Sequence, residues 1–306
     1  RPAHEGEGRA MNFLPGDFSF APAPPGAAPP LPPPKPRAKR PWAAFCLLGL
    51  ILLGCALAGA LAPRDPGYLD LSHIGAPPSP EFWFGTDPMG RDLFSMIWHG
   101  GRVSLLVGCL AAAISTAIAL LYGSVSGVAP AKADAAMMRF IELSLSVPSI
   151  LLVIFLQAVI GRQSPAGIAL VVGVTGWMQM AQVVRGEVRR LRHSAYVLAA
   201  RTMKAGFWHI LRRHLLPNLL SPLMFMVVTN ISAAIATEST LSFLGLGLPV
   251  GVVSWGSLLS QADRALLSGS WWVIVIPGVF LITTLVSITD IGNYIRREGN
   301  KTCSNL

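Results

Sequence analysis

The chain has 306 residues, of which 52% are hydrophobic and only 13% are charged, and its mean hydropathy is +0.55. This composition is too apolar and too poor in charge for an ordinary soluble domain of this length, so it indicates a membrane protein. The formal net charge of +9 does not indicate a nucleic-acid partner, because the basic residues flank apolar runs instead of forming a soluble basic face.

Residues 1–41 form a separate segment before the first apolar run. Within it, positions 15–36 are crowded with proline and alanine, and a basic cluster follows at 35–40. Proline-rich sequence of this kind adopts extended, solvated conformations and cannot bury a core. We therefore predict a cytoplasmic tail that acts as a plain spacer, an interpretation favoured over a ligand for an SH3-type domain.

Six apolar runs follow, each near the length of about 20 mostly apolar residues that a membrane-spanning helix needs. The first run is longer than the apolar part of a secretory signal peptide, which is about 7–15 residues, so we interpret it as a span. The expected fold is an all-α membrane protein with six transmembrane helices. The predicted spans are 42–62, 103–127, 138–160, 166–184, 219–236 and 271–291 within a transmembrane domain at 42–298, and a cytoplasmic tail follows at 299–306.

The basic residues are distributed unevenly around these spans. With the N-terminus inside, most of the 24 lysines and arginines lie on the cytoplasmic side, as the positive-inside rule requires. The opposite orientation would invert this bias, so we predict that both termini are cytoplasmic. The basic residues left outside are Arg64, Arg91, Arg102, Arg162 and Arg264.

A polar turn precedes the second predicted span and lies on the outer side in this topology. Asp87 can cap a short helix that begins near Pro88, and Arg91 can pair with Asp92. We favour such an elbow as a structural brace at the membrane interface over a contact with solute or with another protein, although loops held by rigid spans often carry recognition. The elbow consists of Gly85, Thr86, Asp87, Gly90, Arg91 and Asp92.

The cytoplasmic loop 185–216 predicts a pair of short amphipathic helices. Apolar residues recur at helical spacing, and basic residues occupy other positions around the helix. Gly206 can bend the chain between the two helices, and Pro217 suits the first turn of the next span. A basic amphipathic segment lying on anionic lipid is the alternative. The apolar positions are Ala200, Met203, Phe207, Ile210 and Leu211, and the basic ones include Arg201, Lys204 and Arg212.

Three acidic residues fall within or at the edges of predicted spans. Charge in lipid is costly, so such residues normally face a pathway or a partner. Glu238, followed by Ser242 four positions later, is the main candidate for lining the pathway or pairing across a subunit interface, and we favour the interface. Glu142 and Asp290 lie near cytoplasmic span ends, where local ion pairing or snorkelling is the better interpretation.

Two further features concern helix packing. The segment 123–127, Gly-Ser-Val-Ser-Gly, presents small residues that allow a neighbouring helix to approach closely. Pro148 predicts a kink in the third span, because proline removes a backbone hydrogen bond and clashes with the preceding turn. Such a kink is compatible with a gating helix and with ordinary bundle packing.

Three blocks of sequence carry a family resemblance. Residues 196–206, Tyr-Val-Leu-Ala-Ala-Arg-Thr-Met-Lys-Ala-Gly, and 210–218, Ile-Leu-Arg-Arg-His-Leu-Leu-Pro-Asn, resemble the EAA loop of ATP-binding-cassette importer permeases. Residues 238–247 and 254–256 look like the run that follows this loop in the dipeptide, oligopeptide and nickel branch. The Gly-Thr-Asp-x-x-Gly-Arg-Asp of the elbow is similar to the signature of the C-type subunit of that branch.

The resemblance implies the type I importer permease fold, with a cytoplasmic coupling helix in the EAA-like loop. Two positions depart from the loop motif: Leu198 stands where glutamate is common, and Lys204 stands at the usual glycine, with Gly206 two residues later. The residues implied to couple this chain to an ATPase are Ala199, Ala200, Arg201, Lys204, Ala205, Gly206, Arg212 and Pro217.

The resemblance also implies a non-catalytic permease subunit in a bacterial or archaeal cytoplasmic (inner) membrane. The importer would be ATP-driven and binding-protein-dependent and would carry di- or oligopeptides, with nickel or a metal chelate as the alternative. The implied partners are a homologous B-type permease subunit, two cytoplasmic ATPase subunits, an extracytoplasmic solute-binding protein and membrane lipid. We expect no cofactor on this chain and ATP and Mg on the ATPases, since the sequence contains no phosphate-loop motif.

Two other classes have less support. An ion-coupled secondary transporter would use buried acids as relays and often contains inverted repeats, whereas the acids here are scattered and no convincing repeat is found. A membrane enzyme would need a nucleophile and base, or metal ligands, within the spans. No catalytic or metal site is expected, because the four cysteines form no disulfide or zinc pattern and four histidines lie outside the predicted spans. These histidines are His99, His193, His209 and His214.

Overall fold

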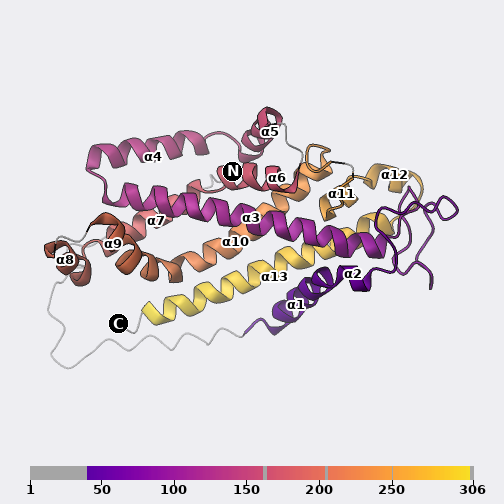
Figure 1. The fold of residues 1–306 in the computed structure, drawn as a ribbon, viewed down its shortest axis with the longest axis horizontal. Coiled ribbons are helices and arrows are strands. Elements are labelled where there is room, and N and C mark those ends of the chain that lie inside the picture. The colour runs from indigo at the N-terminus through magenta and orange to yellow at the C-terminus, as the bar shows by residue number, and fades with distance from the viewer. Residues whose placement is uncertain (1–39, 161–163, 204–205, 250, 304–306) are drawn as a thin grey trace, which may run out of the picture. The chain divides into compact units, whose positions relative to one another are not determined.

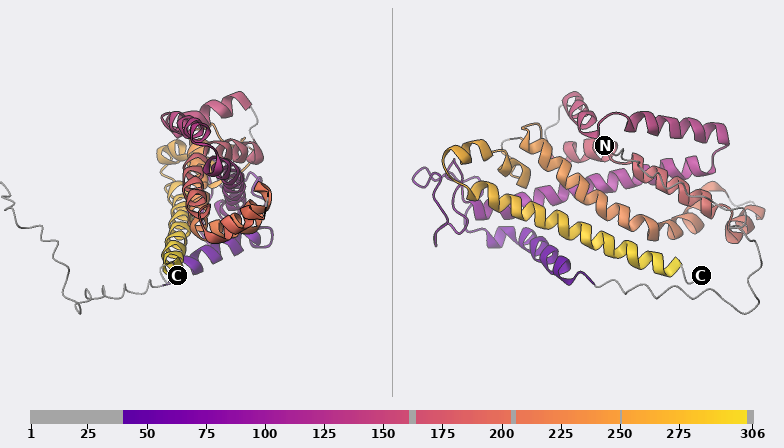
Figure 2. Two further views of the ribbon diagram at one scale, coloured as in Figure 1. Left: turned by 90° about the vertical axis from the view of Figure 1, so that its left-hand side faces the viewer. Right: turned by 180° about the vertical axis from the view of Figure 1, so that it is seen from behind.

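The computed structural model describes residues 40–160, 164–203, 206–249 and 251–303. The regular structure of these ranges is helical, apart from an isolated bridge between Thr86 and Asp92. Figures 1 and 2 show the long helices running side by side, with short helices toward their two ends. The all-α prediction is confirmed for this part of the chain. Of the predicted tail at 1–41, residues 1–39 lie outside the described residues.

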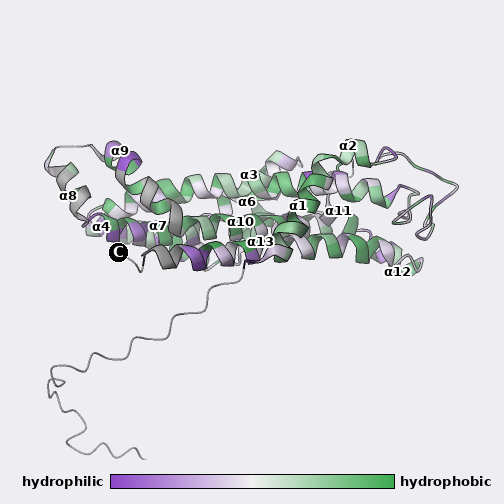
Figure 3. Cartoon of the chain, turned by 90° about the horizontal axis from the view of Figure 1, so that it is seen from below, coloured by the Kyte–Doolittle hydropathy of each residue, from purple (hydrophilic) through white to green (hydrophobic). Residues whose placement is uncertain are grey.

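Three helices contain stretches that are long and apolar enough to cross a membrane. α3 has 36 residues, a length of about 54 Å that exceeds the roughly 30 Å of a hydrocarbon core. It begins before the predicted start at residue 103, because Asp92 caps its first turn. Figure 3 shows hydrophobic residues along the middle of the long helices and hydrophilic residues toward one end. The three helices are α3 (Leu93–Val128), α10 (Leu216–Phe243) and α13 (Trp272–Cys303), and the stretches are Leu93–Val128, Leu223–Phe243 and Trp272–Glu298.

Two pairs of shorter helices meet at sharp bends. α4 (Ala131–Leu145) and α5 (Ser149–Ile160) differ in direction by 89°, and α6 (Pro165–Thr175) and α7 (Met178–Leu191) differ by 48°. The predicted kink at Pro148 is confirmed, but the bend is sharp enough to divide the run 138–160 into two helices. If each bent pair counts as one span, the described residues contain up to five candidate spans.

The first predicted span is a shorter helix than expected. α1 (Trp42–Ala56) has 15 residues, fewer than the about 20 that cross a bilayer, and α2 (Ala58–Leu61) follows it. Arg102 of α3 donates to the carbonyl oxygens of Cys55 and Ala56, the latter at 2.7 Å. These bonds satisfy carbonyl groups at the end of α1 that have no partner within the helix. The count of six spans therefore stays a prediction.

Small residues allow α3 and α7 to pack closely, as the segment 123–127 predicts. A side chain at Gly123 would collide with the carbonyl oxygen of Ala181 and with the side chain of Val184, both on α7. A side chain at Gly127 would collide with Val188 one turn later. The contact between the two helices thus depends on the missing Cβ atoms.

The remaining helices lie toward the two ends of the long ones (Figure 1). The segment between α7 and α10 contains α8 (Ala195–Thr202), α9 (Phe207–Ile210) and a π-helix (Leu211–Leu215). α11 (Trp255–Leu259) and α12 (Ala262–Leu267) lie at the opposite end, near the segment that precedes α3. The EAA-like segment and the elbow are therefore separated by the length of the long helices.

Candidate pathway cavity and coupling segment

Asp87, at the centre of the elbow, closes the turn before α3. Its Oδ1 accepts from the backbone N–H groups of Met89 and Arg91 at 2.8 and 2.9 Å, and its Oδ2 accepts from Arg91 Nε at 2.8 Å. Asp92 instead caps α3, accepting from the N–H and the hydroxyl of Ser95 at 3.0 and 2.5 Å. The predicted roles of the two aspartates were wrong and are exchanged: the turn brings Asp87 onto Arg91, and Asp92 faces the helix start.

Other elbow residues bind neighbouring segments. Gly85 and Gly90 have φ angles of 76° and 78°, which favour glycine because it has no Cβ. The hydroxyl of Thr86 donates to His73 O at 2.5 Å, and its carbonyl accepts from Trp272 Nε1 at 3.0 Å. The elbow thus joins the start of α3 to the start of α13, which is the contact that a structural brace makes.

Asp70 lies in the same extended segment, outside the candidate spans. Its carboxylate accepts from the hydroxyl and the N–H of Ser72 at 2.5 and 3.1 Å and lies 2.8 Å from His73 Nδ1. The hydrogen bonds from the side chains of Ser72 and then His73 lower the pKa of Asp70 to about 2. Asp70 is therefore ionised at neutral pH, and its carboxylate is the acceptor that holds Ser72 and His73 in this turn.

Glu238 is fully enclosed within the chain. Its carboxylate accepts from the hydroxyls of Ser104, Ser239 and Ser242 at 3.1, 3.4 and 2.8 Å. The hydroxyl oxygen of Ser104, on α3, also accepts from the N–H of Trp255 on α11 at 3.3 Å. Glu238 and Ser242 were predicted at a pathway or a subunit interface, and this assignment stays a prediction. Both side chains are buried within this chain, and the surrounding hydroxyls supply the partners that a buried carboxylate needs. Within the chain, Glu238 ties α3, α10 and α11 together.

The other two intramembrane acids were assigned to local roles. Glu142 accepts from Arg139 Nη1 at 3.2 Å, one turn earlier on the exposed side of α4. The predicted local ion pair at Glu142 is thereby confirmed. Asp290 is exposed on α13, which agrees with its assignment to a span end rather than to the interior.

A buried ion cluster that sequence analysis missed joins α3, α4 and α7. Asp134 is 3% exposed, and its carboxylate accepts from Arg185 Nε and Nη2 at 2.5 and 2.6 Å and from Arg189 Nη2 at 2.5 Å. The hydroxyl of Ser126 donates to it at 2.7 Å. Hydrogen bonds between ionised groups are stronger than neutral ones. In the sequence, the one sign of this cluster is that Arg185 and Arg189 stand one turn apart on α7. The positive-inside rule already accounts for basic residues at this position, so their spacing alone does not point to an acidic partner.

The segment between α7 and α10 contains the predicted pair of short helices. α8 ends at Thr202 and α9 begins at Phe207, with Gly206 between them, so the predicted break is confirmed. The apolar faces of both helices pack against residues of α7 and form one buried cluster within the chain. The apolar residues of this cluster therefore do not face lipid. The cluster includes Val197, Ala200, Ile210, Leu211 and Leu215 together with Val184 and Val188.

The outer side of this segment carries exposed apolar side chains. Leu198 is exposed, and Met203 is 83% exposed; Gly206 and Arg212 are exposed as well. Ala200, predicted at the ATPase contact, is buried, so its side chain does not reach a partner in this structure. Lys204 and Ala205 lie outside the described residues, and so do the side chains of Ala199, Arg201 and Pro217.

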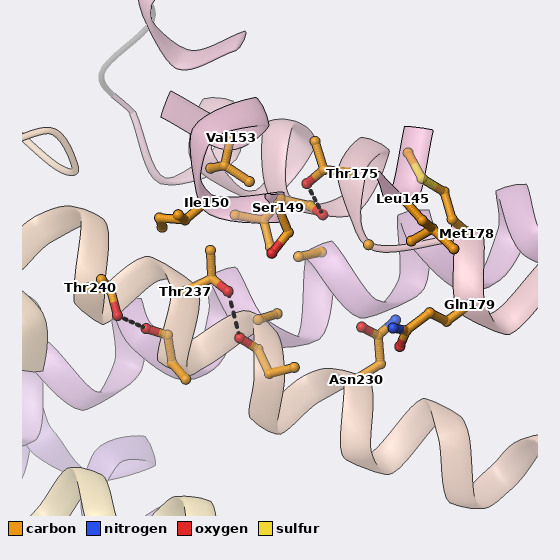
Figure 4. A pocket seen from close by; sticks show the side chains of 16 residues that line it. Leu145, Ser149, Ile150, Val153, Thr175, Met178, Gln179, Asn230, Thr237 and Thr240 are labelled. Carbon is orange, nitrogen blue, oxygen red and sulfur yellow. Dashed lines mark hydrogen bonds between the residues drawn. The ribbon is translucent and has the colours of Figure 1, made fainter. Parts of the chain in front are cut away.

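A cavity of about 380 Å³ lies among α3, α5, α6, α7 and α10. Figure 4 shows polar side chains from several of these helices turned toward one another across it. None of the described residues that line the cavity is charged. Sequence analysis did not single out its polar residues, because they are distributed over four helices and only the fold brings them together. They are Ser149, Thr175, Gln179, Asn230, Thr237 and Thr240.

Comparison with known proteins shows which family the chain resembles along most of its length. Residues 89–295 match the family described as binding-protein-dependent transport system inner membrane component. Over 249 residues the chain is 37% identical to the dipeptide transport system permease protein DppC of Bacillus subtilis, covering 81% of this chain and 77% of that protein. It is 35% identical to the oligopeptide transport system permease protein OppC of Bacillus subtilis, over 82% and 81% of the two chains. It is also 35% identical to the probable D,D-dipeptide transport system permease protein DdpC of Escherichia coli, over 82% and 83%.

The apolar helices and these matches define a multi-pass membrane protein of the transport class. The chain belongs to the family of binding-protein-dependent transport system inner membrane components. The resemblance inferred from the three sequence blocks is therefore confirmed, and the chain is a permease component rather than an enzyme. The matched residues include the cavity, the ion cluster of Asp134 and the segment between α7 and α10.

Proposed function

We propose that the chain is one of two homologous permease subunits in an ATP-driven, binding-protein-dependent importer of di- or oligopeptides. The observation that carries this proposal is the cavity of about 380 Å³ among the central helices, whose described lining residues include no charged group. The volume is typical of small-molecule sites. Relatives of the chain are named for dipeptide and oligopeptide transport, which favours peptides over nickel or a metal chelate. The hydroxyl and amide groups of the described wall residues can form hydrogen bonds with a peptide. Because none of these residues is charged, the affinity stays low enough for the peptide to be released.

The segment from α8 to the π-helix acts as the coupling element in this proposal. Closure of the ATPases has to move the spans by contact alone, so the contacting segment must be joined rigidly to the helices it moves. Two features support rigidity: the apolar faces of α8 and α9 are buried against α7, and the π-helix continues into α10 without a loop. The exposed side chains of Leu198 and Met203 supply the surface that meets an ATPase.

The remaining partners are proposed from membership of the family. A homologous permease subunit completes the pathway, and an extracytoplasmic binding protein delivers solute at the end that carries the elbow and α12. Both termini and the coupling segment face the cytoplasm, where two ATPase subunits use ATP and Mg. The chain itself binds no cofactor, and membrane lipid surrounds the exposed apolar faces of its helices.

Uptake by a reconstituted complex tests this proposal. The chain is purified with its partner permease and ATPase subunits, placed in proteoliposomes with the binding protein, and supplied with radiolabelled alanyl-alanine. We expect uptake that requires ATP and persists when a protonophore is present. Uptake driven by a proton gradient without ATP would overturn the proposal in favour of a secondary transporter, and uptake of nickel in place of the dipeptide would overturn the solute class.

A further inference from the structure

The hydroxyl groups of three threonines in the cavity wall donate hydrogen bonds to backbone carbonyl oxygens of their own helices. Thr237 donates to Ala233 O at 2.9 Å and Thr240 donates to Ala236 O at 2.8 Å, both within α10. Thr175 donates in the same way to the preceding turn of α6 at 3.0 Å, and Figure 4 marks bonds of this kind. A hydroxyl has one proton and two lone pairs. Each threonine therefore offers the cavity acceptor lone pairs and no proton.

Asn230 presents its carbonyl oxygen on the cavity side. The hydroxyl of Ser115 donates its single proton to Ala112 O at 3.1 Å, so its oxygen is left to accept from Asn230 Nδ2 at 2.5 Å. This assignment fixes which way the amide points. Asn230 Oδ1 then lies next to Gly176, a lining residue, whose Cβ would stand 3.6 Å away if it had one. Gln179, on α7, also lines the cavity, and Figure 4 shows its side chain there together with that of Asn230.

We infer that this cavity selects solutes by their N–H groups: it binds the amide N–H and terminal ammonium donors of a peptide and disfavours carboxylates. The inference rests on the proposed function, with the cavity as part of the peptide pathway. Acceptor oxygens face it from the three threonines and Asn230, whereas only Ser149 and Gln179 remain as donors among the described polar residues that line it.

The electrostatics of the two kinds of solute group differ accordingly. An N–H group that leaves water finds oxygen acceptors in the wall, so its lost hydration is replaced. A carboxylate that leaves water meets mainly lone pairs and no cation among the described lining residues, so its lost hydration is not replaced. The same argument disfavours a solute with several outer carboxylates, such as a carboxylate-rich metal chelate, relative to a dipeptide that has one carboxylate beside its N–H donors.

Threonine variants in the reconstituted importer test the inference. The combined change Thr237→Val and Thr240→Val removes two acceptors and nearly keeps side-chain shape. Thr229→Val is the matched control, because Thr229 also lies on α10 and donates to Phe225 O at 3.0 Å but does not line the cavity. We expect uptake of alanyl-alanine at limiting concentration to fall about tenfold in the double variant and to change less than about twofold in the control.

Two further variants separate recognition from a structural effect. Thr237→Ser with Thr240→Ser keeps both hydroxyls and should restore uptake to within about twofold of the unchanged protein. Asn230→Asp adds a carboxylate, so we expect the ratio of lysyl-lysine uptake to alanyl-alanine uptake to rise about tenfold.

The outcomes distinguish the inference from the proposed function. If the unchanged complex transports alanyl-alanine and the valine double variant behaves like Thr229→Val, the inference is overturned while the proposed function stands. Preferred uptake of aspartyl-aspartate over lysyl-lysine by the unchanged complex, at equal occupancy of the binding protein, would also overturn it. If the assembled complex hydrolyses ATP but transports no dipeptide, the proposed function fails and the inference fails with it.

Discussion

Asp134 and Arg185 join α4 to α7 through two parallel hydrogen bonds of 2.5 and 2.6 Å. A bidentate pair of this kind fixes the orientation of the partners as well as their distance. Asp134 lies in the first turn of α4, and α4 begins toward the same end of the long helices as the segment between α7 and α10 (Figure 1). The pair therefore links α4 directly to α7, in addition to the chain connection through α5 and α6.

Removing this carboxylate should destabilise the protein. Asp134→Ala leaves Arg185 without its buried partner, and we expect a loss of about 2–4 kcal/mol in the free energy of unfolding. The matched control is Glu187→Ala on α7, because Glu187 pairs with Arg190 at 2.7 Å in a more exposed position and should contribute less than about 1 kcal/mol. Thermal unfolding in detergent measures both, and equal shifts of the midpoint would contradict the assigned role.

The contact between α3 and α7 should not tolerate a methyl group at Gly123. Gly123→Ala places a Cβ against Ala181 O and Val184, and we expect it to cost about 1–3 kcal/mol. Gly186→Ala on α7 is the control, since a Cβ there meets nothing within 4 Å and alanine favours helix by up to about 1 kcal/mol. A midpoint of thermal unfolding that is unchanged in Gly123→Ala would mean that the two helices pack less closely than described.

The variant Asp87→Ala distinguishes whether the elbow is a structural brace or a recognition site for solute or binding protein. Asp87→Ala removes the acceptor of two backbone N–H groups and of Arg91, so we expect a loss of about 2–3 kcal/mol in stability. Asp65→Ala is the control, because Asp65 accepts from the N–H of Gly67 in an exposed turn. If Asp87→Ala unfolds at the same temperature as the unchanged protein but fails to take up peptide, the elbow is a contact for solute or binding protein instead.

Cysteine labelling should establish the orientation in the membrane. In a background without native cysteines, Leu71→Cys and Met203→Cys replace side chains that are 76% and 83% exposed at opposite ends of the helices. We expect a membrane-impermeant maleimide to label Leu71→Cys in intact cells and Met203→Cys only after permeabilisation. The reverse pattern would invert the predicted topology.

A charge at the exposed end of the coupling segment should uncouple transport. Met203→Glu places a carboxylate where an ATPase is proposed to bind, and we expect peptide uptake to fall by at least about tenfold while membrane insertion is unchanged. Ala133→Glu on α4 is the control, since it adds the same charge at an exposed position outside this segment, the cavity and the end where the binding protein is proposed to bind. Normal uptake with Met203→Glu would exclude this residue from the coupling contact.

Local sequence predicts where the helices lie. A backbone in lipid must satisfy its own hydrogen bonds, so long apolar runs predict helices near α3, α10 and α13. Pro148 predicts the break between α4 and α5, and Gly206 predicts the break between α8 and α9, because each residue alters the backbone at its own position. Helix ends are harder to predict from hydropathy: α3 begins at Leu93 because the side chain of Asp92 caps it.

The sequence by itself determined the membrane class, the approximate helix positions and the family, because hydropathy and short motifs are local properties. Only the tertiary structure decided which polar groups meet. Glu238 bonds Ser104 across 134 positions, and Asp134 bonds Arg185 across 51. Asp87 and Asp92 have the same side chain, and the fold of the turn decided which one bonds Arg91. The cavity likewise combines residues from several helices, because a hydrogen bond or a shared cavity depends on distance in space and not on distance along the chain.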